Sequence, residues 1–153
     1  MALSGALTVA LALASAAGPE RVLLCRPRVT GDAALARGEA VLDAGRRAGC
    51  FLDYGVVCED AAEGARAARR VGLAHALSTT AEGRVAGSRY LLVLSDAASE
   101  GERARRTVAV APGAAAASPL GAAMAELLRS VPAAAPPRRV GPWAAVGAGV
   151  ASL

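Results

Sequence analysis

Histidine and cysteine are the residues of this chain whose chemistry could support catalysis or metal binding. His75 is the only histidine, and the cysteines are Cys25, Cys50 and Cys58. A thiol beside an imidazole can act as a nucleophile with its base, and three cysteines with one histidine match a zinc ligand set by number. However, the spacing contains no close C-x-x-C pair, so it argues against a structural metal site.

Other motifs for chemistry are missing from the sequence. Ser88 is not part of a G-x-S-x-G nucleophile elbow, and a P-loop is excluded because the chain contains no lysine. Glu59 and Asp60 are explained by capping of a following helix. His75 lies one strand period before Leu77, which favours a structural role. We therefore predict no catalytic, cofactor-binding or metal-binding residues, and no cofactor.

Composition and charge limit the class of protein. The 153 residues are enough for one domain, and alanine dominates the 54% apolar content while aromatic residues make up only 3%. The core must therefore be built from leucine and valine, with help from Phe51 and Tyr54. The net charge is +4, but the arginines are interleaved with acidic residues and no aromatic-basic pattern is present, which argues against nucleic-acid binding.

The first 17 residues resemble an export signal. They carry no charged side chain, and the apolar run Leu7–Leu13 is followed by the A-x-A pattern of residues 14–16. We interpret residues 1–17 as a signal peptide or an uncleaved membrane anchor, and we expect the protein to be periplasmic or membrane-associated. Cys25 is not a lipidation site, because Leu24 precedes it where a small residue would be required.

Residues 133–153 form a second unusual end. An alanine- and proline-rich linker leads to Arg138 and Arg139, and Trp143 then opens an apolar stretch that is too short to span a bilayer. We expect a disordered tail or a truncated membrane segment. Either end of the chain could therefore associate with a membrane.

Export makes a disulfide plausible. Cys50 and Cys58 are eight residues apart on one expected strand, and at about 3.3 Å per residue they are too far apart to join. Cys25 can pair with either of them across neighbouring strands. We therefore predict that at least one thiol stays free.

Residues 20–132 are expected to form one α+β domain, a mixed sheet of about five strands with helices packed on it. The expected order is β-α-β-α-β-β-β-α. Apolar runs and turn residues predict strands at 21–25, 50–58, 73–83, 88–95 and 103–111. Helical spacing predicts helices at 32–47, 60–71 and 118–131.

Two of these helices carry recognisable start signals. Asp60 and Glu63 resemble a capping box, and the inner face of the helix they open would be made of alanines at 62, 65 and 68. Ser118 followed by Pro119 predicts the start of the last helix. That helix has one apolar stripe, formed by Leu120, Met124, Leu127, Leu128 and Val131.

Several segments resemble the N-terminal domain of TolB and its relatives in bacterial envelopes, which have an anticodon-binding-like α/β fold. Residues 67–77 resemble a helix end leading into a strand, 89–96 resemble the central strand with a turn at 99–101, and 118–131 resemble the closing helix. The segment between residues 50 and 60 is shorter than in that family, and no β-propeller follows. The resemblance implies a periplasmic scaffold or protein-interaction domain without catalytic residues.

We therefore expect a non-enzymatic envelope protein that binds an unidentified protein partner, through an exposed strand edge or the groove beside the last helix. Two alternatives stay open. One is a small thiol- or metal-dependent enzyme that uses Cys50 or Cys58 with His75. The other is a truncated fragment of a larger membrane protein.

Overall fold

A six-stranded mixed sheet is the centre of the fold in the computed structural model, which describes residues 21–132. The sheet order is β3-β1-β4-β5-β6, and the short β2 pairs with β4 beyond the end of β1. β1 lies parallel to both neighbours, whereas β4, β5 and β6 form an antiparallel meander. The strands are β1 (Val22–Arg26), β2 (Arg28–Gly31), β3 (Phe51–Val57), β4 (His75–Arg84), β5 (Gly87–Asp96) and β6 (Gly101–Val110).

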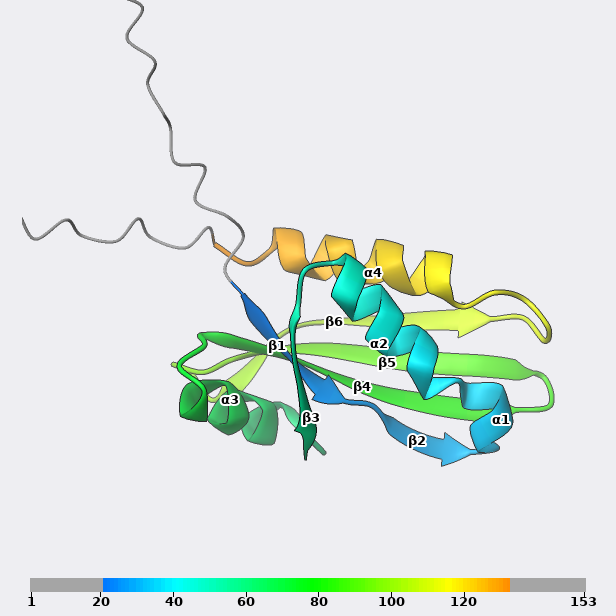
Figure 1. Ribbon diagram of the computed structural model, residues 1–153, viewed down its shortest axis with the longest axis horizontal. Helices are drawn as coiled ribbons and strands as arrows, with labels where there is room; N and C mark the ends of the chain where they lie inside the picture. The colour runs from blue at the N-terminus through cyan, green and yellow to red at the C-terminus, as the bar shows by residue number, and fades with distance from the viewer. Residues whose placement is uncertain (1–20, 133–153) are drawn as a thin grey trace, which may run out of the picture.

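The helices cover the two faces of this sheet unequally. Three of them, α1 (Ala33–Ala36), α2 (Gly38–Arg47) and α4 (Ala117–Arg129), pack on one face. The fourth, α3 (Ala61–Arg70), packs alone on the other face. In Figure 1, α3 lies near the end of the sheet where β4 begins, and the hairpin between β4 and β5 lies at the opposite end.

Two hydrophobic clusters result, one on each face. The major core lies under α1, α2 and α4 and contains large side chains, including Tyr90, Leu92, Leu94, Leu120 and Met124. The minor core lies under α3 and consists of Leu23, Cys25, Cys58, Ala67, Ala68, Ala76 and Ala97. The predicted α+β class with a mixed sheet is confirmed, and so is the apolar stripe of the last helix.

The predicted helix over residues 32–47 is wrong in one respect, because the structure divides it into α1 and α2. Arg37 separates them in a left-handed conformation, with φ of 38°. The turn lets Ala36 enter the major core while α2 continues across β1. Sequence reasoning also missed β2, whose four residues have little apolar periodicity. This strand is held by parallel pairing with β4, from Arg28 opposite Thr80 to Gly31 opposite Gly83.

The predicted N-cap of the last helix is also wrong. α4 begins at Ala117, its N-cap is Ala116, and no side chain caps it. Pro119 is tolerated in the first turn because the backbone N–H groups there have no hydrogen-bond acceptor within the helix, so the missing N–H of proline breaks no bond. The predicted inner face of α3 is partly right, because Ala65 and Ala68 are buried.

The expectations for residues 1–17 and 133–153 lie outside the described residues, as do those for the side chains of Phe51 and Tyr54. Within residues 21–132, no helix is long and apolar enough to cross a membrane. The described chain starts at β1 and finishes after α4 at the same end of the sheet, far from the β4–β5 hairpin (Figure 1).

Candidate functional site

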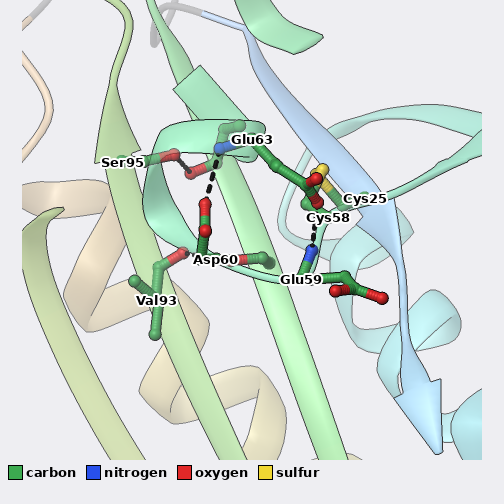
Figure 2. The surroundings of a disulfide bond; sticks show 9 residues. Cys25, Cys58, Glu59, Asp60, Glu63, Val93 and Ser95 are labelled. Carbon is green, nitrogen blue, oxygen red and sulfur yellow. Dashed lines mark hydrogen bonds between the residues drawn. A yellow bond between two sulfur atoms is a disulfide. The ribbon is translucent and has the colours of Figure 1, made fainter. Parts of the chain in front are cut away.

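A disulfide joins Cys25 to Cys58 across the minor core. Cys25 is in β1 and Cys58 follows β3, which is its parallel neighbour in the sheet. Their Cα atoms are 5.9 Å apart, and both side chains are almost fully buried. Figure 2 shows the bond beside the start of α3. Of the two partners that the sequence left open for Cys25, the structure has Cys58, and the predicted free thiol is Cys50.

The start of α3 lies directly after the disulfide and is capped as the sequence predicts. Asp60 Oδ1 accepts a hydrogen bond from the backbone N–H of Glu63 at 2.8 Å. Glu63 Oε2 accepts one from the backbone N–H of Glu59, also at 2.8 Å, one residue earlier than in the usual capping box (Figure 2). The cap and the disulfide together fix the helix start against β1.

Small residues let α3 lie close to the sheet. A Cβ at Gly64 would be 2.7 Å from Ser95 Oγ and 3.5 Å from the Cβ of Ala76. Ser95 is fully buried, and its hydroxyl donates to the carbonyl of Ala76 at 3.3 Å. α3 therefore packs against backbone and small side chains, which bury little apolar area.

The only histidine belongs to a polar cluster at the end of the sheet where the described chain starts and finishes. His75 is the first residue of β4, 4% exposed, and its Nε2 lies 3.4 Å from Asp96 Oδ2. Arg103 Nη1 is 3.6 Å from the same carboxylate, and Arg103 also donates to the carbonyl of Ser130 after α4. The cluster ties β4, β5 and β6 to the end of α4.

The carboxylate of Asp96 is held in its charged form. The backbone N–H of Ser99 is the largest cause that lowers its pKa, followed by the N–H of Ala98 and the charges of His75 and Arg103, while burial opposes them. The two N–H groups donate to Asp96 Oδ1 at 3.0 and 2.8 Å. These hydrogen bonds stabilise the turn between β5 and β6, so the role of Asp96 is structural.

The thiols offer little nucleophilic chemistry. Cys58 is oxidised in the disulfide, and burial raises the pKa of Cys50 to about 11. Since the thiolate is the reactive form, Cys50 is almost entirely protonated at neutral pH. The structure therefore does not bring an active thiol to His75.

Other polar side chains that could take part in chemistry have structural roles. Asp43 forms an ion pair with Arg46 at 3.0 Å. Asp60 caps α3, and Ser88 is a half-buried residue of β5 opposite Gly83. Among residues 21–132, no three His, Cys, Asp or Glu side chains are grouped so that they could hold a metal ion.

Among the described residues, three surface hollows lie around the β4–β5 hairpin, the start of α2 and the loop between β6 and α4. One groove of about 590 Å³ runs between the start of α2 and the start of α4, and alanines at 33, 40, 115, 116 and 117 line much of it. A second, of about 560 Å³, lies beside the hairpin tip and the end of β6. Sequence reasoning located only the groove beside the last helix, because the approach of the two helix starts is a tertiary feature.

Three solved structures have a similar arrangement of elements. The PelC dodecamer from Paraburkholderia phytofirmans is 16% identical with a TM-score of 0.42, covering 71% of this chain and 84% of that one. The LpoB C-terminal domain from Salmonella enterica is 18% identical with a TM-score of 0.39, covering 61% and 83%. Lipoprotein GNA1162 from Neisseria meningitidis is 13% identical with a TM-score of 0.46, covering 63% and 83%. These are bacterial proteins, and one is a lipoprotein.

Neither a protein-family model nor a curated protein matches this sequence. Identities and TM-scores at this level transfer neither a function nor an assembly to the chain.

Proposed function

We propose that this chain is an exported, non-enzymatic domain that binds a protein partner in the cell envelope. The disulfide between Cys25 and Cys58 carries the proposal. Structural disulfides form and persist in oxidising compartments and are rare in the cytosol. The bond agrees with the expected export signal in residues 1–17, which was inferred from a different part of the sequence.

The proposal assigns no reaction to the domain. Its one free thiol is protonated at neutral pH, and its histidine is buried beside Asp96 in a cluster that holds strands together. The TolB-like resemblance belongs to the same proposal, because it implies a scaffold domain of the periplasm.

Two surfaces support partner binding. β6 pairs only with β5 among the described strands, so one of its edges is unpaired and could receive an extended segment. The groove between α2 and α4 is lined by small side chains and could receive a helix or loop. The groove lies at the end of the domain opposite the two chain ends, so a tether at either end would leave it accessible (Figure 1).

The test is to recover the protein from fractionated source cells and map its thiols by alkylation and intact mass. We expect the protein in the envelope fraction, with Cys25 and Cys58 joined and Cys50 alkylated. Recovery from the cell interior with all three cysteines alkylated and Met1 present would overturn the proposal.

A further inference from the structure

The sheet face that carries α3 is covered at only one of its ends. Ala76 and Ser95 lie beneath α3 and are fully buried. Towards the hairpin the same face becomes progressively accessible, because Val93 and Leu91 are half-buried and Arg89 is exposed. α3 starts beside Ser95 and runs away from this region towards the start of β4, and none of the other described helices packs on this face (Figure 1).

The strand register defines which side chains share this region. Arg28, Thr80, Leu91 and Thr107 form one row across β2, β4, β5 and β6. The row closer to the hairpin consists of Thr30, Glu82, Arg89 and Ala109, and the row closer to α3 contains Ser78, Val93 and Arg105. We call this region the open face. It has two half-buried aliphatic side chains at its centre, surrounded by threonine hydroxyl groups, arginines and Glu82, whereas Ser78 is buried.

The open face carries unbalanced positive charge. Arg105 is paired with Glu102, and Glu82 is paired with Arg84. Arg28 and Arg89 have no ion pair within residues 21–132, although most other arginines of the sheet have one. An unpaired guanidinium at the margin of an apolar patch favours a carboxylate from outside the chain.

We propose that the open face docks an acidic segment of the partner protein, with Leu91 and Val93 contacting its apolar side chains and Arg28 and Arg89 binding its carboxylates. This inference rests on the proposed function and assigns the partner to a third surface, different from the β6 edge and the α2–α4 groove. A second copy of this chain does not fit, because it would bring the same unpaired arginines to the interface. A membrane does not fit, because the two aliphatic side chains at the centre, Leu91 and Val93, are half-buried and offer little apolar area to insert into lipid.

The experiment is an NMR titration of the full chain with an end-capped peptide that alternates glutamate and valine, compared with a peptide that has lysine for glutamate. We expect amide shifts along β4, β5 and β6 in the row of Thr80 and Leu91 and in the row of Glu82 and Arg89, and none with the lysine peptide. The double variant Arg28→Glu/Arg89→Glu should weaken binding by about tenfold or more, the effect of roughly 1.4 kcal/mol.

The matched control is Arg47→Glu/Arg129→Glu, which makes the same charge change at exposed arginines on α2 and α4, away from the open face. It should change affinity less than about twofold. Equal weakening by both double variants would overturn the proposal, since it would show only attraction to net charge. Shifts confined to the α2–α4 groove, or tighter binding of anionic vesicles or duplex DNA than of the acidic peptide, would also overturn it. Thiol mapping of the protein from fractionated cells tests export separately, so a failure of the proposed export can be told apart from a failure of the proposed docking surface.

Discussion

The two faces of the sheet are held by different means. On one face, three helices bury large side chains such as Tyr90, Leu92 and Met124 in the major core. On the other, α3 contributes alanines and a glycine, and the minor core is completed by a disulfide. A buried leucine stabilises a fold by about 1.5–3 kcal/mol and alanine by much less, so α3 needs other support. The disulfide and the Asp60 cap supply that support, and the comparison shows how an alanine-rich chain holds a helix with little hydrophobic area.

The largest expected change in stability tests whether one face of the sheet is covered by helices and the other is not. Leu91 and Leu92 are neighbours in β5 that point to opposite faces, and Leu92 is fully buried. Leu92→Ala should lower the free energy of unfolding by about 2–5 kcal/mol because it leaves a cavity in the major core. Leu91→Ala on the open face should cost about 1 kcal/mol or less. Chemical denaturation of both variants measures the difference, and equal losses would contradict an uncovered face.

Removal of the disulfide should affect the minor core first. Cys25→Ala/Cys58→Ala should lower the free energy of unfolding by about 2–4 kcal/mol. Hydrogen exchange should accelerate in α3 and β1 more than in β5, since the bond anchors the start of α3. Cys50→Ala serves as the control and should cost about 1 kcal/mol or less. A uniform acceleration across both faces would mean that the minor core does not depend on the bond separately.

Close packing on the major face can be tested with glycines. A Cβ at Gly45 in α2 would overlap the buried side chain of Leu24, so Gly45→Ala should destabilise the protein by about 1–3 kcal/mol. A Cβ at Gly121 in α4 would meet open space, so Gly121→Ala should raise the free energy of unfolding by about 0.5–1 kcal/mol. Thermal unfolding measures both shifts. A stabilising Gly45→Ala would show that α2 does not lie so close to β1.

The smallest expected effect concerns the polar cluster between the strands and the end of α4. The pKa of Asp96 is lowered in the folded state, so its charge stabilises the fold above the unfolded pKa of about 4, and this stabilisation is lost as the pH falls through the lower folded pKa. Asp96→Asn should therefore cost about 1 kcal/mol at neutral pH. Its cost should vanish in acid, as measured by denaturation between pH 7 and pH 2. A cost independent of pH would contradict the charged role of this carboxylate.

Part of the candidate site followed from local sequence patterns. The capping of α3 by Asp60 and the leucine stripe of the last helix were predictable, because both depend on residues within a few positions of one another. The impossibility of a Cys50–Cys58 bond was also predictable from strand length. The break at Arg37 was not, because it accompanies the burial of Ala36 in the major core, which is a contact between residues far apart in the sequence.

The sequence by itself determined the α+β class, five of the six strands, and the exclusion of a Cys50–Cys58 disulfide, which left Cys25 as the possible partner of either cysteine. Only the tertiary structure decided that Cys58 is the partner of Cys25, because that choice depends on the parallel register that places Arg26 of β1 opposite Val57 of β3. It also decided that α3 covers only one end of its face and leaves Arg28 and Arg89 on the same uncovered region as Leu91. Periodicity and turn chemistry act over a few residues, whereas the register of strands far apart in the chain is fixed only when they pack together.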